Sequence, residues 1–151
     1  MAFSYERRIQ PETPAECVAD ERGLDITVVF TSVPATLAAL RHAAILARNL
    51  TGRITLLVPQ VVPYPRPLSS PPVLIDWNER RFRAIASASP AGTAVRVYLC
   101  RDRDETLLKV LEPRSVVVIG AKRRRWPFSQ ERRLARTLRR AGHDAVLIET
   151  E

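Results

Sequence analysis

A basic cluster near the C-terminal end of the chain holds the side chains best suited to chemistry. Lys122, Arg123, Arg124 and Arg125 follow one another directly, and further arginines recur between positions 132 and 140. Guanidinium groups bind phosphate and carboxylate oxygens through paired, charge-assisted hydrogen bonds. The cluster therefore predicts the binding of an anionic or phosphate-bearing ligand, such as a nucleotide or polyphosphate, rather than catalysis.

The net charge of the chain comes almost wholly from this region. The 151 residues carry a formal net charge of +8, and residues 114–140 hold ten basic side chains against one acidic side chain, Glu131. Two other interpretations of the cluster stay open. It can be a solvated surface that binds nothing, or it can contact nucleic acid or an anionic membrane surface. With nucleic acid, Trp126 and Phe128 within the basic loop would stack on bases.

The remaining reactive side chains form no catalytic or metal-binding pattern. His42 and His143 are far apart in the sequence, as are Cys17 and Cys100, and none of them has the spacing of a metal site or a nucleophile–base pair. We therefore expect no catalytic residue, no metal ion and no enzymatic activity.

Three further side chains are expected to be structural. Asp102 and Asp104 stand at the start of a predicted helix, where negative charge is favoured by the helix dipole. Trp77 lies on another predicted helix, and we expect its ring to have a packing role rather than to stack on a ligand.

The composition predicts a cytoplasmic protein without a membrane span. Hydrophobic residues make up 46% of the chain and charged residues 26%, as in ordinary globular proteins. The two cysteines lack paired spacing, which fits a reducing compartment. No apolar run approaches the roughly 20 residues needed to cross a bilayer, and the first residues lack the apolar stretch of a secretion signal.

The elements that position the basic cluster alternate between strand and helix patterns. Apolar runs predict strands at residues 25–31, 53–58, 93–100, 115–119 and 144–149. Helical spacing of apolar residues predicts helices at about residues 33–51, 73–88, 104–111 and 129–141. This alternation predicts an α/β fold in three layers, with a five-stranded parallel sheet covered on both faces. Residues 25–151 form this domain, and residues 1–24 are expected to be an irregular N-terminal arm.

The predicted strand order, 3-2-1-4-5, brings two loops together at one end of the sheet. Ligands of such sheets gather at the carboxyl ends of the strands, where the order reverses. Here the loop at residues 31–34 would meet the basic loop at residues 120–128. The candidate binding residues are Thr31, Ser32, Gly120, Lys122, Arg123, Arg124, Arg125 and Ser129. Ser129 is included because it starts a helix whose exposed N–H groups attract anions.

Three stretches of the chain resemble the universal stress protein family over about residues 24–150. They are TSVPATLAALRHAAILARNLTGRITLLVPQVVP, SVVVIGAKRR and TLRRAGHDAVLIE. The resemblance implies the adenine nucleotide alpha hydrolase-like fold and a role in stress response or regulation. It also implies a phosphate loop of the pattern Gly-x2-Gly-x9-Gly-Ser/Thr in ATP-binding members, with an Asp at the end of the first strand.

The chain departs from that ATP-binding pattern at several positions. Gly120 fits the first glycine, but Arg123 stands in the place of the second, and Thr31 stands in the place of the Asp. A glycine matters there because backbone N–H groups approach phosphate closely only where no Cβ intervenes. We therefore expect a non-ATP-binding type without a cofactor. A nucleotide-binding or nucleotide-hydrolysing protein with a rearranged phosphate loop remains the alternative.

The last predicted strand is expected to form a dimer interface. Residues 145–148, Ala-Val-Leu-Ile, carry no charge, and an uncharged strand at a sheet edge tends to be covered. The family that the chain resembles pairs this strand with the same strand of a second copy. We therefore predict a homodimer.

Overall fold

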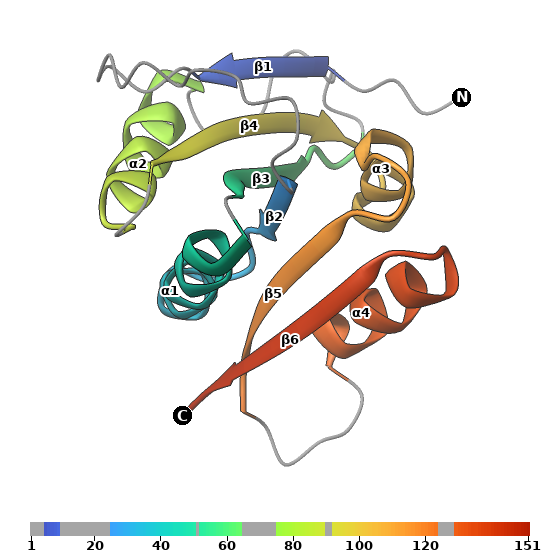
Figure 1. Cartoon of the computed structure of the whole chain (residues 1–151). Coiled ribbons are helices and arrows are strands. Elements are labelled where there is room, and N and C mark those ends of the chain that lie inside the picture. Colours follow the sequence, from blue (N-terminus) through green and yellow to red (C-terminus); the bar gives the residue numbers. More distant parts are fainter. Residues whose placement is uncertain (1–4, 10–24, 51, 65–74, 90–91, 124–128) are drawn as a thin grey trace.

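The computed structural model describes residues 5–9, 25–50, 52–64, 75–89, 92–123 and 129–151. In these residues six strands form one sheet and four helices cover it (Figure 1). The strands are β1 (Tyr5–Ile9), β2 (Asp25–Val29), β3 (Arg53–Val61), β4 (Thr93–Cys100), β5 (Val116–Lys122) and β6 (Asp144–Thr150). The helices are α1 (Val33–Leu50), α2 (Ile75–Ser87), α3 (Arg103–Val110) and α4 (Gln130–Arg140).

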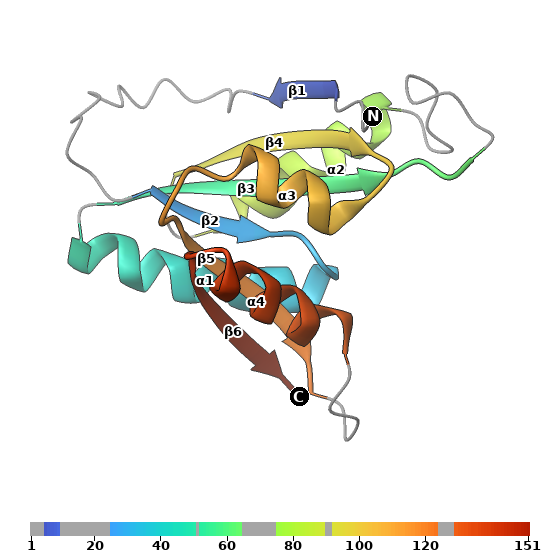
Figure 2. The same cartoon turned by 90° about the vertical axis from the view of Figure 1, so that its right-hand side faces the viewer.

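The sheet has the order β1-β4-β3-β2-β5-β6. Strands β2 to β6 all run parallel to one another, which confirms the predicted α/β fold and the strand order 3-2-1-4-5. Their arrowheads in Figure 2 show the common direction of β2, β3 and β4. We call the side of the sheet where these parallel strands end the carboxyl edge.

The sixth strand comes from the segment that was predicted to be an irregular arm. Strand β1 pairs antiparallel with β4, with Tyr5 opposite Leu99 and Ile9 opposite Val95. Without it, β4 would be an open edge, and an open edge offers a row of backbone groups to any extended segment. Pairing of this kind depends on the partner strand more than on local sequence, so the short segment showed no strand pattern by itself. Residues 10–24 of the predicted arm lie outside the described residues.

Two helices cover each face of the sheet. Helices α1 and α2 lie on one side and α3 and α4 on the other (Figure 1). The small residues Ala39, Ala43 and Ala47 recur every four positions on α1, and they let its backbone lie close to the strands. Leu134 and Leu138 have the same spacing on α4 and are completely buried on the opposite face.

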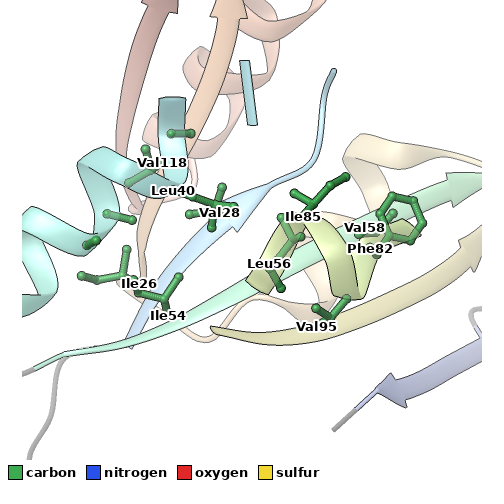
Figure 3. Packing of buried hydrophobic residues seen from close by; sticks show 14 of the residues in the cluster. Ile26, Val28, Leu40, Ile54, Leu56, Val58, Phe82, Ile85, Val95 and Val118 are labelled. Carbon is green, nitrogen blue, oxygen red and sulfur yellow. The ribbon is translucent and has the colours of Figure 1, made fainter. Parts of the chain in front are cut away.

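The core is built around the central strand β2. Ile26 and Val28 face α1, whereas Val29 belongs to the cluster under α3 and α4, and all three are fully buried. Figure 3 shows the first cluster, in which Phe82 and Ile85 of α2 close the packing over β3 and β4. A strand buried on both faces explains why its apolar residues run without alternation.

Strand β5 continues farther than the sequence indicated. It was expected to end at Ile119 and to give way to a loop at Gly120, but Gly120, Ala121 and Lys122 remain strand. They pair with Ile148, Glu149 and Thr150 of β6. The glycine and the first cation therefore belong to the sheet and have a defined direction.

Candidate functional site

The seam between β2 and β5 lies where the sequence placed it. The two strands pair directly, with Val29 opposite Ile119. Beyond the end of β2, the Thr31 hydroxyl donates a hydrogen bond of 2.7 Å to the Gly120 carbonyl oxygen. The Thr31 N–H donates to Oγ1 of Thr36 at 3.2 Å, in the first turn of α1. Thr31 thus joins the loop, the helix and β5, and its polar groups are occupied by these contacts.

Gly120 has a packing role that the sequence did not reveal. A Cβ built at this position would lie 2.1 Å from the Ala35 carbonyl oxygen and 3.1 Å from the Ala35 Cβ. Real atoms cannot approach so closely, so only glycine lets the first turn of α1 reach β5 here. Gly120 fits the first glycine of a phosphate loop, but the close contact between α1 and β5 explains why a glycine stands here.

Lys122 and Arg123 extend past this contact into solvent. Both side chains are exposed, and the Arg123 N–H donates to the Thr150 carbonyl oxygen at 2.7 Å, which continues the pairing of β5 with β6. Because side chains alternate along a strand, Lys122 shares with Gly120 the face on which α1 lies. Arg124 and Arg125, the other two cations of the predicted site, fall outside the described residues.

Ser129 caps helix α4. Its hydroxyl accepts a hydrogen bond of 3.2 Å from the Arg132 N–H, and its carbonyl accepts one of 3.1 Å from the Arg133 N–H. The helix start predicted from the sequence is confirmed. The Ser129 oxygens therefore satisfy the backbone of the helix rather than remaining available for a ligand.

The arginines of α4 divide into two groups. Arg132 donates from Nε to Glu149 Oε1 at 3.1 Å and also from Nη2 to the same oxygen, which neutralises its charge. Arg139 donates from Nε to the Ala145 carbonyl oxygen at 3.0 Å. Both side chains tie α4 to β6. Arg133 and Arg136 are exposed. The uniform basic segment of the sequence is therefore partly structural and partly a solvated surface.

The end of β4 carries a second set of polar residues at the carboxyl edge. Asp102 caps α3, as predicted, by accepting the Glu105 N–H at 2.9 Å. Arg103 pairs with Asp104 at 3.2 Å, so that these two charges offset each other. Arg101 donates from Nη1 to the Val62 carbonyl oxygen at 2.8 Å and stacks over the ring of Tyr64.

Two aromatic residues near this edge are exposed, which was not predicted from the sequence. Trp77 is 55% exposed, so it lies outside the core, and its ring contacts the Arg81 guanidinium. Tyr64 is 78% exposed. Tyr64 lies between Pro63 and Pro65 in the connection between β3 and α2, and Trp77 lies in the first turn of α2. These positions are the sequence signal that could have found them. In a parallel sheet, the connection from the carboxyl end of a strand to the helix that follows it stays at the carboxyl edge. Residues at both ends of this connection therefore lie at that edge.

The nucleophile and metal predictions can be compared with the described residues. Cys100 is buried, and burial is the main cause that raises the pKa of its thiol, so the thiol stays protonated near neutral pH. His143 is buried and accepts the Ser115 N–H at Nδ1 at 3.3 Å, which is a structural role. In the described ranges, no three His, Cys, Asp or Glu side chains lie close enough to share a metal ion.

No described helix combines the length and apolar character that a bilayer crossing requires. No protein-family model matches the chain, and no curated protein matches it. The function must therefore be argued from the residues at the carboxyl edge.

Proposed function

We propose that the protein is a cytoplasmic, universal stress protein-like regulatory domain that binds an anionic, phosphate-bearing ligand beside Lys122 and Arg123. The single observation that carries the proposal is the position of these two exposed cations. They stand at the end of β5, one strand from Thr31, where α1 begins. A ligand there would act in stress response or regulation without being chemically changed.

Three features of this position favour an anion. The first turn of α1 contains no acidic residue. Its backbone N–H groups and helix dipole give the start of the helix a partial positive charge. Ser32, immediately before the helix, is exposed and can donate its hydroxyl. Lys122 shares the face of the sheet on which this helix lies, so the ammonium group and the helix start can meet one phosphate.

The proposal excludes ATP as the favoured ligand for a geometric reason. Phosphate loops use glycines to bring backbone N–H groups next to the phosphates. At Gly120 the space that lacks a Cβ is already taken by the Ala35 carbonyl. Thr31 has no carboxylate, and its hydroxyl is committed to the Gly120 carbonyl. Recognition would depend on charge rather than on a shaped nucleotide site.

The proposal includes a homodimer formed through β6. This strand ends the sheet order, and among the described strands it pairs only with β5. Val146, Leu147 and Ile148 on β6 are half-buried. A second copy that paired there would satisfy the exposed backbone groups and cover these apolar side chains.

Isothermal titration calorimetry with inorganic polyphosphate and ATP tests the ligand proposal. The variant Lys122→Ala/Arg123→Ala should bind polyphosphate at least about tenfold more weakly than the wild type, because each charge-assisted contact is worth roughly 1.5–3 kcal/mol. ATP should bind more weakly than polyphosphate to the wild-type chain.

The matched control removes two charges at the opposite end of the sheet. Arg48 lies in the last turn of α1 and Arg53 begins β3, and both are exposed. Arg48→Ala/Arg53→Ala should leave polyphosphate affinity within about twofold of the wild type at fixed salt. Equal losses in the two double variants would mean that net charge, not a site, attracts the ligand. Flat titrations of the wild type would refute the proposal.

A further inference from the structure

Exposed apolar and aromatic side chains gather at the carboxyl edge. Of the five large hydrophobic residues that are exposed in the described part of the chain, three belong to this edge. Val61 ends β3, Tyr64 follows it, and Trp77 lies in the first turn of α2. The other two, Ile45 and Leu108, are on the separate helices α1 and α3. Exposed aromatic rings concentrated at one edge indicate a binding surface.

Tyr64 forms a stacking platform with Arg101. The guanidinium carbon of Arg101 lies 4.0 Å from the centroid of the Tyr64 ring. Its Nη1 donates to the Val62 carbonyl oxygen at 2.8 Å, which holds the guanidinium in place. The Tyr64 side chain is nevertheless 78% exposed. One face of the ring is thus covered by a cation, and the opposite face is open to a planar ligand.

Trp77 forms a second platform with Arg81. The guanidinium carbon of Arg81 lies 5.9 Å from the ring centroids of both Trp77 and Phe30. Phe30 in turn meets Phe82 edge to face at 5.1 Å, which anchors this group to the core. Arg81 is exposed, and the Trp77 side chain is more than half exposed. Trp77 and Arg81 therefore repeat the combination of an exposed aromatic ring with an adjacent cation.

The topology puts both platforms and the cations of β5 at the same edge. Strands β3, β4 and β5 are parallel and end there, and α2 begins there because it returns to the start of the parallel strand β4. The arrowheads in Figure 2 mark this end for β3 and β4. Strands β3 and β2 lie between β4 and β5, so the ends of β4 and β5 are at least three strand spacings, about 14 Å, apart, and the twist of the sheet spreads them farther (Figure 1). A strand that reaches from one end to the other therefore needs more than about four stacked nucleotides.

We infer that this edge binds single-stranded nucleic acid. Unpaired bases would stack on the open faces of Tyr64 and Trp77, since every base has a planar face and an exposed aromatic ring binds it with little sequence preference. Arg81, which is exposed beside Trp77, would neutralise a phosphate there. The remaining phosphates of the strand would contact Lys122 and Arg123, and for these contacts the inference rests on the proposed function.

An extended single strand fits the arrangement better than a mononucleotide or a duplex. The two platforms come from different elements and use different arginines, so a single base would occupy only one of them. In a duplex the base faces are stacked on each other and cannot meet a side-chain ring. Only a strand with several unpaired bases can use both rings and the row of cations.

Fluorescence anisotropy of the full chain with a labelled oligo(dT) of about twelve nucleotides tests this inference. The variant Tyr64→Ala/Trp77→Ala should bind the oligonucleotide at least about tenfold more weakly than the wild type, because two stacking contacts are lost. Its affinity for inorganic polyphosphate should not change, since polyphosphate has no bases. The control Ile45→Ala/Leu108→Ala removes exposed apolar side chains elsewhere and should bind as the wild type does. Thermal unfolding of each variant verifies that it is folded.

Salt dependence gives a second readout. The logarithm of the affinity should fall with the logarithm of salt concentration by about 0.7 for each phosphate contacted on a single strand, and so by about 2 for the three cations Arg81, Lys122 and Arg123. A duplex of the same length and a thymidine monophosphate should both bind more weakly than the oligonucleotide. Equal binding of either one would overturn the inference.

The outcomes separate this inference from the proposed function. If the aromatic variant binds oligo(dT) like the wild type while Lys122→Ala/Arg123→Ala loses polyphosphate, the anion site stands and the nucleic-acid inference is wrong. If the aromatic variant loses oligo(dT) while polyphosphate fails to bind the wild type, the aromatic surface stands and the proposed anion site is wrong. If neither polymer binds, both fail.

Discussion

At Gly120 the backbone of β5 passes so close to the first turn of α1 that no other residue fits. The obstacle is the Ala35 carbonyl, which belongs to the helix backbone and cannot rotate away as a side chain would. Replacing a glycine that is needed for packing has a different effect from replacing a glycine that is needed for phosphate binding. The first affects the stability of the fold, and the second affects only the bound state.

Gly120→Ala should therefore lower the free energy of unfolding by about 2 kcal/mol or more, as overpacking of a closely packed contact does. Urea denaturation followed by circular dichroism measures this loss. Gly92→Ala is the matched control, because a Cβ at Gly92 meets nothing within 4 Å. A Gly120→Ala variant as stable as the wild type, with impaired polyphosphate binding, would instead restore the phosphate-loop interpretation of this residue.

The element formed by β5, α4 and β6 is held together by arginines. Arg132 reaches Glu149 with two donors, Arg139 reaches the Ala145 carbonyl, and Ser129 caps the helix. These contacts place α4 against the last strand. Because Arg132 is paired with Glu149, the binding of an anion at the carboxyl edge depends on other cations.

Arg132→Ala should destabilise the fold by about 1 kcal/mol, the upper part of the range for a partly exposed ion pair, because two donors meet the same carboxylate. Its polyphosphate affinity should stay near that of the wild type. Arg133→Ala removes an equally charged but exposed neighbour and should change the unfolding free energy by less than about 0.5 kcal/mol. An Arg132→Ala variant with the unfolding free energy of the wild type would show that the pair with Glu149 contributes nothing.

The parts of the fold that sequence reasoning found are those with strong local signals. Val116, Val117 and Val118 form a β-branched run, and such a run predicts a buried strand without knowledge of its neighbours. The continuation through Gly120 to Lys122 was missed because it depends on pairing with β6, a contact between segments far apart in the chain. The same reason applies to β1.

The candidate site was predicted less completely than the fold. The meeting of Thr31 and Gly120 followed from the strand order and is confirmed. The division of the arginines into structural and exposed groups was not predictable, because it depends on where Glu149 and the Ala145 carbonyl lie in space. The stacking of Arg101 on Tyr64 likewise joins the ends of two strands and has no local signature.

At the scale of the whole molecule, the proposed dimer can be measured directly. Size-exclusion chromatography with light scattering at micromolar concentration should give twice the mass of 17.0 kDa for the wild-type chain. Val146→Lys places a charge on the half-buried strand β6 and should give the single-chain mass. A wild-type mass equal to that of one chain would contradict the dimer.

Strand β1 shortens the border that the sheet offers for further association on the side of β4. A sheet with two open borders can add copies at both, and the product is a fibre that grows without limit. Here β1 covers the border of β4 and becomes the border itself, so the sheet ends in β1 on one side and in β6 on the other. The five-residue β1 therefore replaces the eight-residue β4 as the open border, and a shorter border offers fewer backbone groups to another molecule.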